Sequence, residues 1–195
     1  MQKRLELRIS PPVAVMLAIM ILTDRSGICL LTLAAAFLHE CGHILAARAL
    51  HIPLGSVRMD FLGARIDVRG RLLSYGEEWL LAAAGPLCSL LAAALGAGLW
   101  HVSDYARIFS CASLILGLLN LLPIRTFDGG RMAECLLLRC TSERIAERVM
   151  RTLSFLFLFL LWATAVYFLL RAGDGLSLLC FSMSLLFRFF DGDTL

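Results

Sequence analysis

Six apolar runs, separated by shorter polar segments, dominate the pattern along the chain. A transmembrane helix needs about 20 apolar residues, and the second to fifth runs reach or approach that length. The first and sixth runs are shorter and would also suit re-entrant or interfacial segments. The runs cover residues 11–22, 27–50, 79–100, 105–123, 153–170 and 176–187. The pattern predicts an all-α membrane protein, a polytopic bundle of about six transmembrane helices.

The composition supports a membrane protein and excludes several other classes. Hydrophobic residues make up 59% of the chain and charged residues 17%, and the mean hydropathy is +0.82. Soluble domains contain roughly 45–50% apolar and about 25% charged residues, and a chain of this size has too small a core to hide the excess. A water-soluble enzyme, a disordered chain and a disulfide scaffold are therefore excluded. The 7 cysteines form no CxxC pair, which favours a role as small packing residues.

The positions of the basic residues predict an orientation in the membrane. If the chain crosses six times, every lysine and arginine except Arg25, Arg107 and Arg171 falls on the same side. Basic residues are enriched in cytoplasmic loops, so the pattern places both termini and the two longer loops in the cytoplasm. We therefore expect a multi-pass protein of the cell membrane.

The two longer loops carry structural predictions of their own. Residues 52–70 contain β-branched residues around Gly63 and predict a short cytoplasmic β-hairpin after the second span. Within it, the 57–68 segment would either offer a strand edge to an extended substrate or be a plain surface hairpin. Residues 131–150 predict an amphipathic helix on the membrane surface.

The second apolar run contains the most specific chemical motif, His39-Glu40-Cys41-Gly42-His43. Residues i and i+4 of a helix share a face, so both imidazoles can reach one zinc ion. Glu40 stands beside them and can act as general base toward a water molecule. Ionisable residues at membrane depth are costly and indicate function. The alternative is a hydrogen-bonded polar cluster that joins helices.

A catalytic zinc site needs a third protein ligand, and Asp128 is the best candidate in this chain. His51 follows the second run in a loop, and His101 lies at the opposite surface, where an interfacial role is expected. Asp128 stands just past the fourth run, on the same side as His43. The alternative is that Asp128 caps the N-terminus of the next helix. Asn120, which opens this stretch, is likewise open to a role as a helix-terminal cap.

Together, these motifs resemble the site-2 protease family of intramembrane zinc metalloproteases. The resemblance covers residues 27–131. An HExxH motif in an early span is followed by a Gly-Pro element in the next long span, and by an N-x-x-P and a D-G-G-R motif at the end of a later one. In this chain these elements are His39–His43, Ala84-Gly85-Pro86, Asn120–Pro123 and Asp128–Arg131.

The resemblance implies one zinc ion per chain and a role for each motif residue. The implied metal ligands are His39, His43 and Asp128, and the implied catalytic residues are Glu40 and Asn120. The implied activity is hydrolysis of a peptide bond in or near a transmembrane segment of a membrane-associated substrate, a transcription-factor precursor or regulator. A membrane-protein regulator and the lipid bilayer are further expected partners, and nucleic acid is not.

The size of the chain and the side on which its site lies resemble one branch of this family. The small six-span form with a cytoplasm-facing site is similar to the sporulation branch, which processes a membrane-associated pro-sigma-K factor. We expect one domain over residues 1–195, without a PDZ domain or the nucleotide-sensing CBS domain common in that branch. The family often has Asn where this chain has Ser89. Gly85-Pro86 is expected to break its helix locally, to allow close packing of small residues, or both.

Two other functions compete with proteolysis. One is a proteolytically inactive zinc-binding membrane scaffold, against which Glu40 argues because such a site needs no base. The other is a transporter that uses the same ionisable residues as a metal or proton path. The absence of an internal repeat and the scarcity of other intramembrane charges argue against a transporter.

Overall fold

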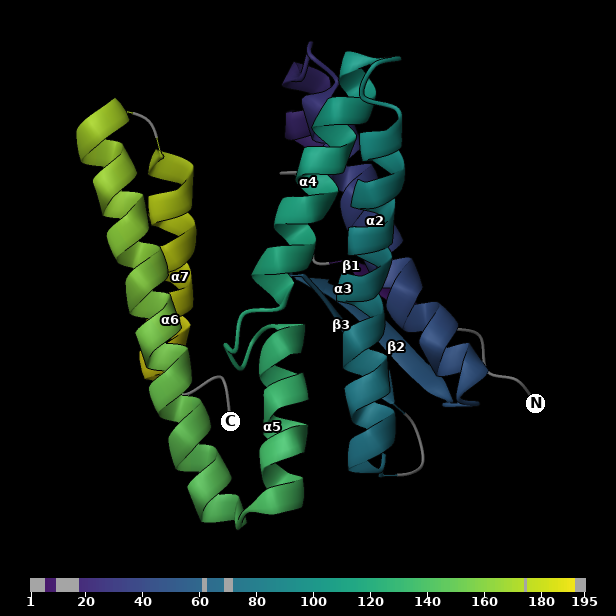
Figure 1. Cartoon of the computed structure of the whole chain (residues 1–195), viewed down its shortest axis with the longest axis vertical. Coiled ribbons are helices and arrows are strands. Elements are labelled where there is room, and N and C mark those ends of the chain that lie inside the picture. The colour runs from purple at the N-terminus through teal and green to yellow at the C-terminus, as the bar shows by residue number, and fades with distance from the viewer. Residues whose placement is uncertain (1–5, 10–17, 61–62, 69–71, 174, 192–195) are drawn as a thin grey trace. The chain divides into compact units, whose positions relative to one another are not determined.

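The computed structural model of the 195-residue chain forms two compact units, residues 1–119 and residues 120–195. Figure 1 shows the elements of both units. The structure describes residues 6–9, 18–60, 63–68, 72–173 and 175–191.

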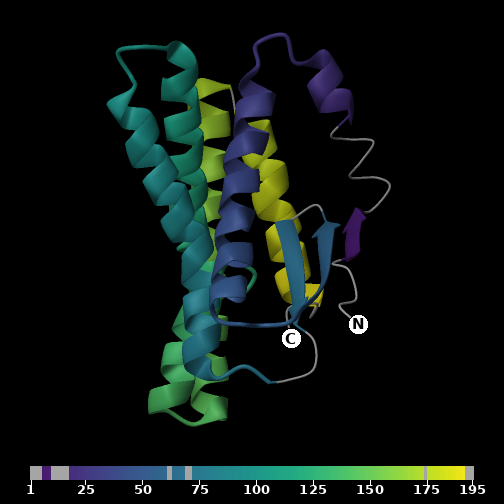
Figure 2. The ribbon, with the colours of Figure 1, turned by 90° about the vertical axis from the view of Figure 1, so that its right-hand side faces the viewer.

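The first unit contains three long helices, α2 (Ile28–Ala49), α3 (Tyr75–Gly98) and α4 (Asp104–Asn120). Their bounds closely match the second, third and fourth apolar runs, because hydropathy and helix length are local properties of the sequence. Figure 2 shows α2 beside α3. A Cβ atom added to Gly42 would lie 2.5 Å from the carbonyl oxygen of Ala84, so the two backbones are in direct contact there.

Local hydrogen bonds define the ends of these helices. α3 begins with a capping box, in which the Ser74 hydroxyl accepts a bond from the Glu77 N–H and the Glu77 carboxylate accepts one from the Ser74 N–H. α2 ends in a Schellman motif: His51 has a φ of 54°, and the N–H of Ile52 donates to the carbonyl of Ala47 at 2.8 Å.

A carboxylate organises the turn before α2. Asp24 accepts bonds from the hydroxyl and N–H of Ser26 and from the N–H of Cys29. These bonds hold the pKa of Asp24 below its usual value. The bond from the Ser26 hydroxyl has the largest effect, and the bonds from the backbone N–H groups add to it.

A three-stranded sheet accompanies the helices of the first unit. The order is β1 (Glu6–Ile9), β2 (Leu54–Asp60) and β3 (Gly63–Val68), with β1 parallel and β3 antiparallel to β2. The hairpin expected after the second apolar run falls on β2 and β3, and its cytoplasmic location stays a prediction. The pairing of β1 was not predicted, because a four-residue strand whose partner lies far away in the sequence leaves little local signal.

The second unit contains α5 (Asp128–Cys140), α6 (Glu143–Ala172) and α7 (Leu176–Asp191). α6 and α7 pack together through aromatic side chains, with the ring centres of Phe155 and Phe189 6.0 Å apart. The prediction of one surface helix over residues 131–150 is wrong. The chain turns after Cys140, and the second half of that segment continues into the fifth apolar run as a single 30-residue helix.

Among the described residues, α2, α3 and α6 are long and apolar enough to cross a membrane. α4 and α7, with 17 and 16 residues, are shorter than these, and the described part of the first apolar run is the short helical stretch 18–22. The structure therefore supports a membrane protein with three such helices, and the number six stays a prediction. The expected break at Gly85-Pro86 is wrong, because α3 continues through Pro86.

Replacement of the cap of α3 should lower stability. We expect Ser74→Ala to lower the free energy of unfolding by about 0.5–2 kcal/mol, since it leaves an N–H at the helix start without its acceptor. Ser142→Ala is the matched control, because Ser142 holds the same N-cap position of α6 and makes no side-chain cap bond. Unfolding in detergent micelles, followed by circular dichroism, measures both. Equal losses in the two variants would contradict the prediction.

Candidate metal centre

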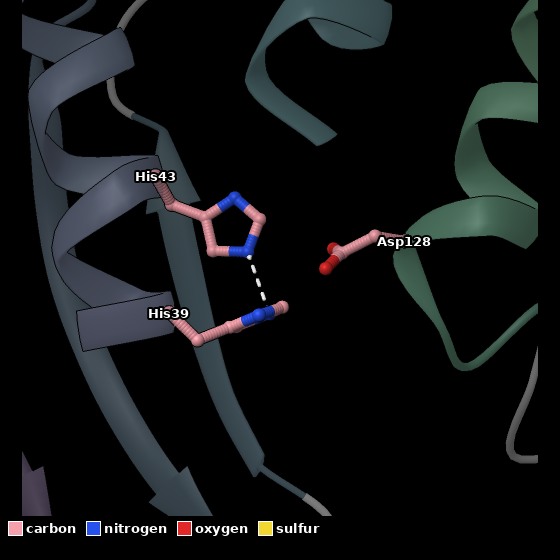
Figure 3. Close-up of side chains that lie close together, drawn as sticks. All are labelled: His39, His43 and Asp128. Atoms are coloured by element: carbon pink, nitrogen blue, oxygen red, sulfur yellow. Dashed lines mark hydrogen bonds between the residues drawn. The ribbon is translucent and has the colours of Figure 1, made fainter. Parts of the chain in front are cut away.

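Two imidazoles lie together on the face of α2 that packs against α3. The side chains of His39 and His43 are both buried, and they stand one helical turn apart, as the motif spacing requires. Their Nε2 atoms are 3.3 Å apart (Figure 3). The structure thus brings together the two histidines that the sequence singles out.

Both rings are oriented by bonds to α3. Nδ1 of His43 lies 2.8 Å from the carbonyl oxygen of Leu81, and Nδ1 of His39 lies 2.9 Å from the hydroxyl oxygen of Ser89. A carbonyl can only accept, so Nδ1 of His43 carries the proton, and Nε2 of the neutral ring presents a lone pair. A ring held in this way is the usual arrangement of a metal-ligating histidine.

The spacing of the two Nε2 atoms fits a tetrahedral metal ion. Two zinc–nitrogen bonds of about 2.0–2.1 Å at a tetrahedral angle place their nitrogen atoms about 3.3–3.4 Å apart. The observed separation between His39 and His43 is 3.3 Å. The pair therefore has the geometry of two zinc ligands before any further residue is considered.

A glycine lets these two imidazoles lie directly against the backbone of α3. A Cβ atom added to Gly85 would overlap Nε2 of His43 and would lie 2.8 Å from Nε2 of His39. Any side chain at position 85 would therefore displace the two imidazoles from their present positions. The Gly-Pro element of the sequence is explained by this requirement and by close helix packing, rather than by a helix break.

Three other candidate residues of the first unit are Glu40, His51 and His101. Glu40 follows His39 on α2 and is half-buried. His51 is the left-handed residue of the Schellman motif, and His101 is exposed in a turn. Both positions have local structural explanations.

Asp128 belongs to the second unit, where it is the first residue of α5 and is buried. The N-cap is Phe127, so the alternative role of Asp128 as N-cap is not what the structure shows. A Cβ atom on Gly129 would overlap the carbonyl of Leu121, and one on Gly130 would overlap the carbonyl of Ile124. The two glycines thus let the preceding loop fold tightly over the start of α5, next to the carboxylate.

The same loop is tied to its neighbours by polar contacts. The N–H of Arg125 donates to the hydroxyl of Ser154 on α6 at 3.1 Å, and the guanidinium of Arg125 pairs with Glu134 of α5 at 3.0 Å. Asn120 is the last residue of α4 and is half-buried. These contacts give the loop that precedes Asp128 a fixed shape within its unit.

Sequence reasoning missed the groups that orient the histidines. Ser89 was noted only as a departure from a family pattern, although it is fully buried and bonded to His39. The Leu81 carbonyl carries no side-chain signal at all. Of the two, only Ser89 had a usable signal, because it is a polar residue four positions after Gly85 in an apolar helix.

Comparisons with known proteins find a family model, curated relatives and a solved structure that are similar to this chain. The model of peptidase family M50 matches residues 96–164. The Rip3 proteins of two Mycobacterium tuberculosis strains, Erdman and H37Rv, whose names describe zinc metalloproteases, are 33% identical over 124 residues, an alignment that covers 58% of this chain and 32% of each relative. The chain therefore spans about a third of the length of the curated relatives it matches.

A solved structure shares the fold. The site-2 protease from Methanocaldococcus jannaschii has a TM-score of 0.65 with this chain at 18% identity, and the alignment covers 98% of this chain and 93% of that one. Together, the comparisons show similarity to peptidase family M50 over residues 96–164, similarity to the Rip3 proteins over 124 residues, and a fold shared with a site-2 protease. They do not single out the sporulation branch, which stays a prediction.

A side chain at position 85 should abolish metal binding. We expect Gly85→Ala to reduce the zinc content of the purified protein from about one ion per chain to near zero, because the added methyl group overlaps Nε2 of His43 and crowds Nε2 of His39, so both rings must move. Elemental analysis in detergent measures the content. Gly98→Ala is the control in the same helix, since a Cβ atom there meets nothing within 4 Å. Zinc retention by Gly85→Ala would show that the ion lies elsewhere.

Proposed function

We propose that the chain is a site-2-type zinc metalloprotease that hydrolyses a peptide bond in or near a transmembrane segment of a membrane-associated substrate. One observation carries the proposal. On a helix apolar enough to cross a membrane, two buried imidazoles converge at an Nε2 separation of 3.3 Å, with a glutamate next to the first of them. A helix-joining polar cluster would not need this convergence, nor the close approach of both imidazoles to the backbone of Gly85.

We further propose that His39 and His43 of the first unit and Asp128 of the second bind one zinc ion per chain. Two imidazoles and one carboxylate are a common ligand set of catalytic zinc, which keeps its fourth position for water or substrate. The support for Asp128 is its burial, its position outside the N-cap, and the tight loop that fixes it.

The side chains near this site would carry out the proton transfers. Bound zinc lowers the pKa of water and polarises a carbonyl group. Glu40 takes a proton from the attacking water and passes it to the leaving nitrogen. The amide of Asn120 donates a hydrogen bond to the substrate, at its backbone or at the oxygen that becomes negatively charged.

The membrane arrangement and the substrate belong to the same proposal. We place both termini and the site toward the cytoplasm in a six-span arrangement, on the strength of the basic loops. A helical peptide bond is shielded, so the substrate must be extended before it is cut. Because β1 pairs with one edge of β2, the outer edge of β3 is available among the described strands for an extended substrate. The proposed substrate is a transcription-factor precursor or regulator, and the sporulation branch supplies one example.

Removal of the ligands should remove the metal. We expect about one zinc ion per chain in the wild type, and clear loss in the double variant His43→Ala with Asp128→Ala, since one imidazole alone cannot hold the ion. Elemental analysis of folded protein, purified in detergent without chelators, measures the content. His101→Ala is the control, as that imidazole is exposed in a turn. A folded wild type that holds no zinc would overturn the proposed function.

Glu40 should matter for the reaction and not for the metal. We expect Glu40→Gln to keep its zinc and to cleave about 10²–10⁴-fold more slowly, because the amide cannot accept the proton. Synthetic peptides with an apolar segment, analysed by mass spectrometry, are the probe, and Glu147→Gln, on an exposed part of α6, is the control. Undiminished cleavage by Glu40→Gln would exclude the proposed base. A zinc-loaded wild type that cuts none of the peptides would favour the inactive scaffold.

A further inference from the structure

Ser89 makes an unusual contact for a serine in an apolar helix. Its side chain is fully buried, and its hydroxyl oxygen lies 2.9 Å from Nδ1 of His39 on another helix. Serines in helices commonly bond to a carbonyl of the preceding turn, as Ser182 does with Leu179 in α7. The contact of Ser89 instead joins α3 to α2 at the metal centre.

The two imidazoles are held by different kinds of group. The partner of His43 is the backbone carbonyl of Leu81, which every residue type provides. The partner of His39 is the side chain of Ser89, which a single substitution removes. A substitution at position 89 can therefore change the orientation of His39, whereas no substitution of Leu81 removes the carbonyl that orients His43.

The neighbouring helix restrains Ser89 from the other side. A Cβ atom added to Gly117 of α4 would lie 3.1 Å from Cβ of Ser89, so the glycine lets α4 pack directly against the serine. Ser89 thus sits between α4 and the imidazole of His39. The packing of three helices determines where its hydroxyl group lies.

We propose that Ser89 is a positioning residue for the metal centre, which holds the ring of His39 so that Nε2 points at the ion. The hydroxyl oxygen accepts the bond from Nδ1–H, which leaves the lone pair on Nε2 and keeps the ring from turning. This inference rests on the proposed metal site and deepens it, since it assigns to Ser89 a share of the zinc affinity. In this role Ser89 acts through the ring of His39 and is not itself a metal ligand.

The experiment compares two buried serines. We expect Ser89→Ala to weaken zinc binding about 10- to 100-fold, measured by competition with a fluorescent chelator in detergent, because partners of ligating histidines have effects of this size. Ser113→Ala is the matched control, since Ser113 of α4 is equally buried and its hydroxyl oxygen has no hydrogen-bond partner. We expect its zinc affinity to equal that of the wild type.

Two further readouts separate positioning from a general loss of structure. Cobalt bound in place of zinc reports on ligand geometry through its visible spectrum, and we expect the spectrum to change in Ser89→Ala and to stay the same in Ser113→Ala. Ser89→Cys keeps a weak donor and acceptor of similar size, so its zinc affinity should lie between those of the wild type and Ser89→Ala. The melting temperatures of the zinc-free proteins show whether each variant remains folded.

The possible outcomes are distinct. A folded Ser89→Ala protein with wild-type zinc affinity and an unchanged cobalt spectrum overturns this inference, while the proposed function stands as long as His43→Ala with Asp128→Ala loses the ion. Equal weakening in Ser89→Ala and Ser113→Ala also overturns it, because the loss would then follow from packing alone. A wild type without zinc overturns the proposed function itself. Selective weakening with a changed spectrum supports the inference.

Discussion

The backbone contact between α2 and α3 is the constraint on which the rest of the metal centre depends. Gly42 lets the backbone of α2 meet the carbonyl of Ala84, and one residue further along α3 Gly85 leaves room for two imidazoles. Only at this separation can a backbone carbonyl of α3 reach Nδ1 of His43. A larger residue at position 42 would push the helices apart, and both the bond to Leu81 and the alignment of the rings would be lost. The small residues of these helices thus serve the geometry of the site, in addition to the close packing that they allow in membranes.

The same contact explains how an apolar helix tolerates polar residues. Burial of an imidazole is costly unless its nitrogen atoms find partners, and α3 supplies one partner for each Nδ1. The two Nε2 atoms are left 3.3 Å apart, where two lone pairs would repel each other and a shared cation would bind to both. A cation that binds only the folded arrangement adds its binding free energy to the stability of the fold. On the proposed function, the metal therefore stabilises the arrangement in which α3 orients the two imidazoles of α2.

Much of this arrangement could be predicted from the sequence, because the signals are local. The spacing of His39 and His43 fixes a shared helical face, and the apolar runs give α2, α3, α4 and α7 to within a few residues. The start of α6 could not be predicted from hydropathy, since its first turns are charged and only its later part is apolar, although nothing between Glu143 and Ala172 interrupts the helix. β1 and the partners of the two imidazoles could not be predicted, because they depend on contacts between segments that are distant in the sequence. The Leu81 carbonyl is the extreme case, since a backbone group leaves no trace in the residue type.

The candidate ligands differ in how they are fixed, and this difference bears on the proposed chemistry. The imidazoles are aligned by interhelical bonds within the first unit, and Asp128 is fixed by the loop that Gly129 and Gly130 allow to fold over the start of α5 in the second. Each candidate ligand is therefore oriented by its own surroundings within its unit, so the ordering of the individual side chains would cost little entropy if an ion binds.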